Sequence, residues 1–157
     1  MTVLAELKKY LALHNIEVWE YAEPTATAAA AATAVGCTVA EIAKTLLFLV
    51  GGSPVVVVTC GDMKVKSSRL KQAFGLSGKV KLPQADEVLN YTGYAPGGVC
   101  PFLLPSELPL LLDASLQRFP VVYAAAGNNH SAVPVTASQL EQLTAGGYAD
   151  LCDPISE

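Results

Sequence analysis

The chain has 157 residues, of which 52% are hydrophobic and 15% are charged. This length and apolarity suit one core, so we expect a single domain over residues 1–157 without long disordered tails. The net charge of −4 argues against a strongly basic nucleic-acid binder. No apolar stretch is free of the Gly, Pro and hydroxyl residues that a bilayer span disfavours, and no export leader begins the chain, so we expect a cytoplasmic protein that does not enter membranes.

Hydrophobic periodicity and the positions of Gly, Pro and hydroxyl residues predict helices and strands that alternate along the chain. The first half is expected to hold a helix over 2–14 capped by Thr2, a strand over 16–21, an alanine-rich helix over 25–36, a helical turn over 38–44 and a hairpin of strands 45–50 and 53–60. The second half is expected to hold helices over 66–74, 84–90 and 137–144 and strands over 79–82, 108–116, 121–127 and 133–136. We therefore expect an α/β fold, with a mixed, curled β-sheet and helices outside it.

The cysteines and the charges give two further expectations. Four cysteines stand far apart, without a CxxC pair or zinc-finger spacing, so neither a metal nor another cofactor is predicted. Seven of the ten basic residues fall between 44 and 81, where Asp62 is the only acid. This segment is either a run of ordinary solvated charges or a basic face on an acidic protein.

Lys44 directly precedes an apolar strand in the sequence EIAKTLLFLV. A long cation at the mouth of a strand can reach into a cleft without deep burial of its charge. A lysine that merely extends its stem along the strand end is common, and position alone favours that simpler explanation.

The segment TGYAPGGVCPF, residues 92–102, places Gly97 and Gly98 between two prolines. The backbone amides of such a rigid turn can approach a ligand closely enough to form an oxyanion hole. A tight structural corner is the alternative. Cys100 in this turn invites a nucleophile hypothesis, which needs a neighbouring base and a depressed pKa. Asn128 and His130 follow a predicted strand, where loops commonly present polar groups.

The motifs AKTLLFLV, TGYAPGGVCPF, LLLDASL and VVYAAAG, in this order and spacing, resemble the YbaK and prolyl-tRNA synthetase-associated domain family of aminoacyl-tRNA deacylases. The resemblance spans nearly the whole chain. It implies a barrel-like mixed sheet with outer helices and hydrolysis, in trans, of amino acids wrongly esterified to tRNA. Small amino acids such as cysteine or alanine on proline tRNA are the implied substrates, and an aminoacyl-tRNA synthetase is a further implied partner.

The resemblance also implies roles for individual residues. Lys44 matches the family lysine that contacts the substrate near the 3′ acceptor end of tRNA, and Thr45 accompanies it. Gly97 begins the turn whose amides face the scissile ester. Tyr21 matches an aromatic residue of the pocket. Pocket positions are also implied for Asn128, His130 and Cys100.

An aminoacyl ester is already activated, so positioning and charge stabilisation suffice without a protein nucleophile. The attacking group is expected to be water or, for a cysteinyl ester, the thiol of the substrate itself. A module that binds the tRNA 3′ end without hydrolysis is the main alternative. A hydrolase of another small ester is the third.

Overall fold

The computed structural model describes residues 3–155. Its α-helices are α1 (Val3–Ala12), α2 (Ala28–Val35), α3 (Ser67–Phe74), α4 (Ala85–Thr92) and α5 (Ala137–Thr144), with 3₁₀ turns η1 (Val39–Glu41) and η2 (Ala114–Arg118). Its first five strands are β1 (Trp19–Glu20), β2 (Ala43–Val50), β3 (Ser53–Cys60), β4 (Met63–Val65) and β5 (Val80–Lys81). The remaining strands are β6 (Leu110–Asp113), β7 (Val122–Ala124), β8 (Ser131–Val135), β9 (Gly147–Ala149) and β10 (Cys152–Pro154).

The strands form a mixed α/β fold with three sheets. The largest has the order β5-β2-β3-β6-β9, in which β2 runs antiparallel to both neighbours while β3, β6 and β9 are parallel. A second sheet has the antiparallel order β1-β8-β7, and β4 pairs with β10. None of these sheets closes into a barrel within residues 3–155, so the expected barrel-like core is not supported. An isolated parallel bridge between Ile42 and Tyr123 joins the start of β2 in the large sheet to β7 in the second sheet.

The central hairpin forms as its sequence predicts. β2 and β3 pair from Ala43 with Cys60 to Val50 with Ser53, and the two glycines between them both adopt positive φ. The helix expected over 25–36 is also confirmed, because Thr27 caps α2 through its hydroxyl and Gly36 ends it in the left-handed region. These elements position the start of β2 beside the first turn of α2.

Several expectations differ from the structure in detail. The strand expected over 16–21 is only two residues long, and β4, β9 and β10 were not expected because each has three residues, too few to show a periodicity. The predicted strand 108–116 ends at Asp113, whose side chain accepts from the Ser115 amide and starts η2. Lys66, without a side-chain cap bond, occupies the N-cap position of α3. The proposed cap Thr2 lies outside the described residues.

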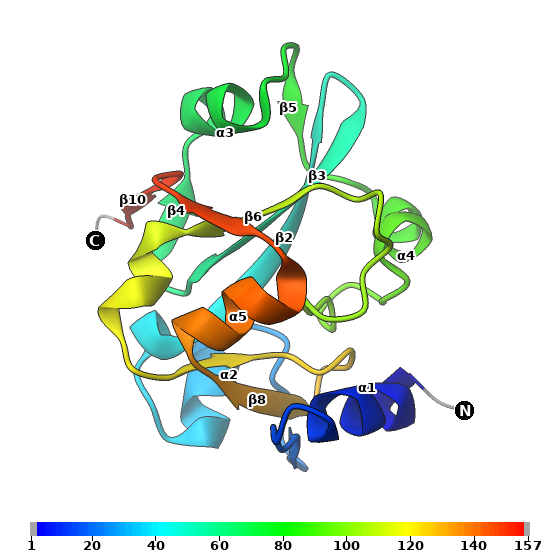
Figure 1. Ribbon diagram of the computed structural model, residues 1–157, viewed down its shortest axis with the longest axis vertical. Coiled ribbons are helices and arrows are strands. Elements are labelled where there is room, and N and C mark those ends of the chain that lie inside the picture. Colours follow the sequence, from blue (N-terminus) through cyan, green and yellow to red (C-terminus); the bar gives the residue numbers. More distant parts are fainter. Residues whose placement is uncertain (1–2, 156–157) are drawn as a thin grey trace.

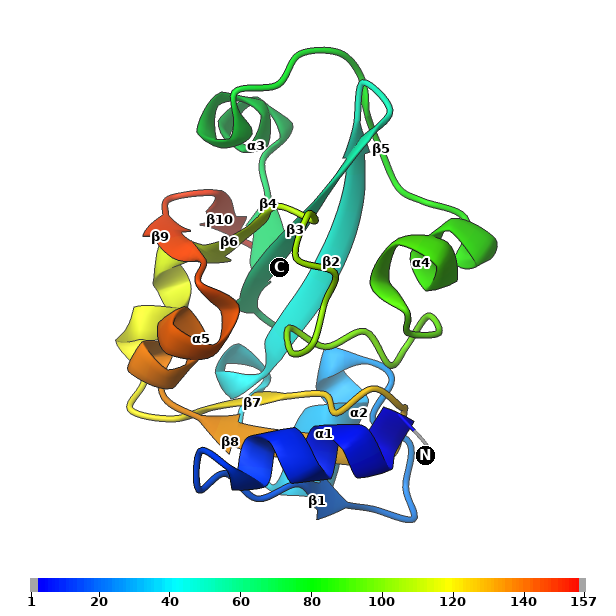
Figure 2. The ribbon, with the colours of Figure 1, turned by 45° about the vertical axis from the view of Figure 1, so that its right-hand side comes forward.

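The helices are spread around the sheets, with α3 at the top and α1 and α2 at the bottom of the view (Figure 1). In Figure 2, α1 lies in front of β7 and β8, and its Leu7 and Leu11 are completely buried. α3 lies at the far end of the β2–β3 hairpin from α2. No helix formed by residues 3–155 has both the length and the apolarity needed to cross a membrane.

Candidate active site

A cavity of about 380 Å³ opens where the start of β2, the first turn of α2, strands β7 and β8 and the glycine turn converge. These elements surround the lower end of β2 in Figure 2. Much of its wall is alanine, contributed by α2, β2, β7, β8 and the residues next to them, so the cavity is lined largely by small side chains. Of the eight residues that sequence reasoning singled out, the structure brings three to this wall: Lys44, Thr45 and Gly97.

Lys44 is the charged residue of the cavity wall. It is half-buried on β2 opposite Thr59 of β3, and it forms no ion pair with any residue of the range 3–155. Burial lowers the pKa of its ammonium group, and this shift is partly opposed by Cys152, by the Asp62 carboxylate and by Cys60. A desolvated cation without a close partner is suited to bind an anion or a developing negative charge.

The hydroxyl groups of the cavity wall fall into two kinds. Thr25 and Ser131 satisfy each other, since Thr25 Oγ1 donates to the Ser131 carbonyl at 3.2 Å and accepts from its amide at 3.1 Å. The Ser131 hydroxyl in turn accepts from the Ala126 amide at 3.0 Å. Thr45 Oγ1, by contrast, is buried without a partner among the described residues. Leaving such a group unpaired costs about 1–3 kcal/mol.

The glycine turn presents one of its two glycines to the cavity. Gly97 lines the wall at a φ of +86°, which disfavours any residue with a Cβ, and the Gly98 amide donates to the Ala95 carbonyl at 3.0 Å. A Cβ on Gly98 would lie 2.8 Å from the Asn128 Cα. Gly98 therefore allows two backbone segments to touch, and its amide already has an acceptor.

Buried groups hold this turn in place from behind. The Tyr94 hydroxyl donates to the Phe102 carbonyl across the base of the loop, and the Cys100 thiol donates to the same oxygen at 3.7 Å. Cys100 is fully buried outside the cavity wall, and burial raises the pKa of its thiol to about 11. These surroundings suit a packing role better than that of a thiolate nucleophile.

The other three predicted residues lie together in a separate loop contact. The Tyr21 amide donates to the His130 carbonyl at 2.8 Å, and the His130 amide donates to Asn128 Oδ1 at 2.9 Å. The exposed ring of His130 contacts the Glu23 carbonyl through Nδ1 at 3.2 Å. None of the three contributes to the cavity wall, although their loops flank it.

Tyr123 supplies the aromatic ring of the cavity wall instead of Tyr21. Its ring centroid lies 5.8 Å from that of Trp19. Sequence reasoning passed over it because Tyr123 sits inside a predicted strand, VVYAAAG. That segment is continuously apolar, so nothing in its pattern distinguishes Tyr123 from its buried neighbours Val122 and Ala124.

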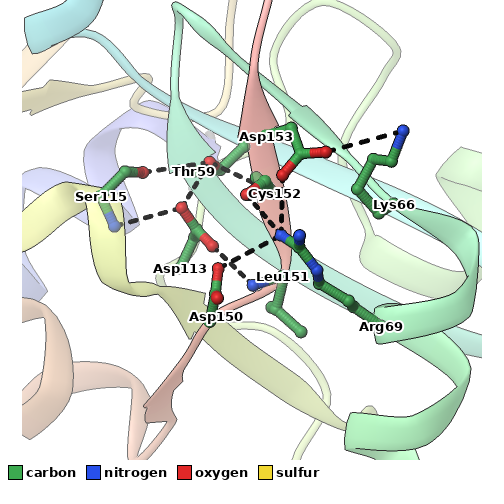
Figure 3. Close-up of polar contacts among 9 residues, drawn as sticks. All are labelled: Thr59, Lys66, Arg69, Asp113, Ser115, Asp150, Leu151, Cys152 and Asp153. Carbon is green, nitrogen blue, oxygen red and sulfur yellow. Dashed lines mark hydrogen bonds and ion pairs between the residues drawn. The ribbon is translucent and has the colours of Figure 1, made fainter.

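Thr59, which pairs with Lys44 across β2 and β3, belongs to a buried polar network (Figure 3). Asp113, only 1% exposed, accepts from Thr59 Oγ1 at 3.4 Å and from the amides of Ser115 and Leu151 at 3.1 and 2.9 Å. Thr59 also contacts the Cys152 thiol at 3.4 Å. The network joins β3 and β6 to the C-terminal segment, and so fixes the strand against which β2 positions Lys44.

No group of three or more His, Cys, Asp or Glu side chains in the described part of the chain is arranged to hold a metal ion.

Comparison with known proteins identifies the family. Residues 22–143 match the model of the aminoacyl-tRNA editing domain. The chain is 36% identical over 138 residues, 87% of each chain, to the uncharacterised protein YwhH of Bacillus subtilis. It is 32% identical over 91 residues to proline–tRNA ligase of Staphylococcus aureus, a match that covers 58% of this chain and 16% of the ligase.

A solved structure gives the same result at the level of the fold. The crystal structure of a proposed trans-editing enzyme for prolyl-tRNA synthetase superposes with a TM-score of 0.86 over 98% of both chains, at 29% identity. The chain belongs to the aminoacyl-tRNA editing domain family, as the resemblance of its motifs predicted. Its place there is that of a YbaK-like domain.

Proposed function

We propose that this protein is a trans-editing hydrolase that deacylates mischarged aminoacyl-tRNA. The observation that carries the proposal is the cavity, which combines a desolvated lysine, a glycine turn and a wall of small side chains in a chain of this family. Such a cavity suits a small amino acid, with alanine or cysteine on proline tRNA as the expectation from sequence. The similarity to part of proline–tRNA ligase supports that choice of tRNA.

In the proposed mechanism, Lys44 binds the phosphate or carbonyl side of the terminal adenosine. Water attacks the ester carbonyl carbon, and the carbonyl oxygen becomes an oxyanion that the turn amides stabilise. The bond between that carbon and the ribose oxygen then breaks, and the ribose oxygen takes up a proton. The products are the free amino acid and tRNA with an intact 3′ end.

The geometry refines the oxyanion hypothesis for the turn. The Gly98 amide already donates to Ala95, whereas Gly97 and Val99 both line the cavity. Amides at these two positions are better placed than that of Gly98 to receive the oxyanion. Gly98 then contributes by letting the turn pack against the Gly127–Asn128 backbone.

The basic residues of the segment 64–81 provide a path for the acceptor stem of the tRNA. Lys66 and Arg69 are neutralised in part by Asp150 and Asp153 (Figure 3). Lys79 and Lys81 are exposed and form no ion pairs within residues 3–155. Lys81 pairs with Leu49, five residues along β2 from Lys44 and hence about 17 Å away. Phosphate contacts there would add affinity that does not depend on sequence.

Single-turnover hydrolysis of a panel of charged tRNAs tests the proposal. Release of a small amino acid from a mischarged tRNA, above the spontaneous rate, supports a deacylase. Saturable binding of the same tRNAs without release would favour the non-catalytic module. Comparable turnover of an ester that lacks tRNA would favour the small-ester hydrolase.

A further inference from the structure

The amino group of an aminoacyl ester finds no carboxylate in the cavity wall. An α-amino group has a pKa of about 8, so it is largely an ammonium group at neutral pH. The described residues of the wall include no Asp or Glu, and the charged residue among them is Lys44, which repels a cation. A side chain of the wall that binds this ammonium group must therefore be one without a formal charge.

The hydroxyl groups of the wall already serve the fold. Thr25 and Ser131 are bonded to each other, and the Thr27 hydroxyl caps α2. Thr45 is paired with the core residue Val58 on β3, and its hydroxyl is buried. An aromatic ring is the other kind of uncharged side chain that attracts a cation, through the negative potential over its face.

The register of the β1-β8-β7 sheet places the side chain of Tyr123 on the face that lines the cavity. Tyr123 pairs with Pro134 of β8, and Trp19 of β1 pairs with Ala132 of the same strand. Because Ala132 and Pro134 are two residues apart, these side chains all lie on one face of the sheet. Ala132 and Tyr123 both line the cavity, and Tyr123 is partly exposed there.

Neighbouring side chains hold the Tyr123 ring in place. Its centroid lies 5.8 Å from that of the Trp19 ring, and the two ring planes are inclined by 36°. Tyr123 also packs against a buried cluster that includes Ala31 and Ile42, and both of these residues line the cavity. A ring held in this way loses little conformational freedom when a ligand binds to it.

The surroundings of Tyr123 favour a cation as well. Burial raises the pKa of the Tyr123 hydroxyl, and the neighbouring Cys37 and Glu41 raise it further. A carboxylate that disfavours a phenolate favours a positive charge at the same place. Ile42, which bridges to Tyr123, precedes Lys44 by two residues, or about 7 Å along β2. The wall therefore has a cationic part and, apart from it, a part that attracts cations.

We propose that the aromatic ring of Tyr123 binds the α-ammonium group of the esterified amino acid through a cation–π interaction. The proposal rests on the proposed function and adds a substrate contact to it. With the ammonium group at Tyr123, Lys44 and the turn at Gly97 remain for the negatively polarised parts of the ester. The aminoacyl group is thereby held in one orientation, and an acyl group without the ammonium binds less tightly.

Binding of hydrolysis-resistant analogues tests this contact separately from turnover. The probes are 3′-amino-3′-deoxyadenosine acylated through its amide with alanine or with lactate, in which a hydroxyl replaces the ammonium group at nearly constant volume. Calorimetric titration at about pH 6 keeps the alanyl group protonated. We expect the unmodified protein to bind the alanyl analogue at least about fivefold more tightly than the lactyl analogue.

Three variants assign this preference to the ring. Tyr123→Leu keeps an apolar side chain without the ring and should reduce the preference to less than about twofold. Tyr123→Phe keeps the face of the ring and should keep the preference. Tyr10→Leu is the matched control, because Tyr10 is a partly buried tyrosine of α1 outside the cavity wall, and it should leave both affinities unchanged. If Tyr123→Leu lacks a cooperative melting transition, Tyr123→Met takes its place.

Each outcome decides the matter. Equal affinity of the unmodified protein for the two analogues overturns the proposal, as does failure to bind either. A preference that survives in Tyr123→Leu overturns it, because another group then binds the ammonium. An equal loss of affinity for both analogues in Tyr123→Leu overturns it too, since the ring would then contact a part that they share. Loss of the preference in Tyr123→Phe would assign the contact to the hydroxyl instead of the ring.

The deacylation assay separates this proposal from the proposed function. Alanyl-selective binding that depends on Tyr123, without any deacylation of tRNA, would uphold the ammonium contact and refute the proposed hydrolysis. Deacylation by a protein that binds both analogues equally would uphold the hydrolysis and refute the contact.

Discussion

The amide of Gly98 donates a hydrogen bond to the carbonyl of Ala95, and this contact closes the turn that faces the cavity. It separates the roles of two adjacent glycines. Gly97 is exposed to the cavity at positive φ, whereas Gly98 is buried against the backbone of Gly127 and Asn128. The two residues should therefore respond differently to substitution.

Gly97→Ala should lower the rate of deacylation far more than it lowers stability. The left-handed backbone costs an alanine about 1 kcal/mol, and the new methyl group would meet only Ala26, at 3.4 Å. Gly36→Ala is a matched control, because Gly36 has nearly the same φ, +85°, with no atom within 4 Å of the added Cβ and no place in the cavity wall. Equal loss of activity in the two variants, measured at equal melting temperature, would refute a role for the turn in catalysis.

The lowered pKa of Lys44 predicts that substrate binding depends on pH. Burial lowers the pKa of the Lys44 ammonium group from the usual 10.5, while Cys152, the Asp62 carboxylate and Cys60 raise it in part. If the charged form binds substrate, affinity for a hydrolysis-resistant analogue is present at low pH and lost as pH rises through this pKa. Asp62→Asn removes the opposing carboxylate, so the loss should begin at a lower pH.

Titration of analogue binding against pH measures this shift. Asp150→Asn is the control, since it removes a carboxylate that pairs with Arg69 instead. An alkaline limb that stays in place in Asp62→Asn would show that Lys44 does not titrate in the binding step.

The exposed lysines near the far end of β2 should contribute to tRNA affinity through phosphate contacts. Lys79→Ala with Lys81→Ala should reduce the slope of log affinity against log salt by about 2. Lys8→Ala with Lys9→Ala, on α1, removes the same charge from another surface. If both pairs of substitutions change the slope equally, net charge alone accounts for the effect.

The network around Asp113 should be important for stability. Asp113→Asn replaces one acceptor oxygen by a donor in a site that supplies three donors, and should lower the free energy of unfolding by about 2–3 kcal/mol. Ser115→Ala removes a hydroxyl contact to Thr59 at 3.4 Å and one to the Cys60 thiol, and should cost less than about 1 kcal/mol. Chemical denaturation compares the two, and similar losses would contradict the central place of Asp113.

The predictable parts of the fold have long, strong local patterns. The β2–β3 hairpin follows from two apolar runs and a Gly-Gly turn, and α2 follows from its hydroxyl cap and terminal glycine. The arrangement of the sheets did not follow, because pairings such as β6 with β9 join segments whose three or four residues show no periodicity. The barrel-like core was an implication of the resemblance that these open sheets do not support.

In the candidate site, too, residues of local motifs could be predicted, whereas features that depend on packing could not. Lys44, Thr45 and Gly97 belong to contiguous motifs, and the fold brings them to one cavity. Tyr21 was expected in the pocket and Tyr123 was not considered, because the place of Tyr123 depends on how β7 lies beside the start of β2 through the Ile42–Tyr123 bridge. The orphaned hydroxyl of Thr45 could not be predicted at all, because a missing partner is a property of the packed structure.

The most direct test of the central claim compares the unmodified protein with Lys44→Ala in single-turnover hydrolysis of mischarged tRNAs. Lys44 forms no ion pair within residues 3–155 and its charge is desolvated, so Lys44→Ala should leave the melting temperature unchanged or higher. We predict that the unmodified protein releases a small amino acid and that Lys44→Ala loses this activity. An unchanged rate in the folded Lys44→Ala protein would contradict the assignment of this cavity as the deacylation site.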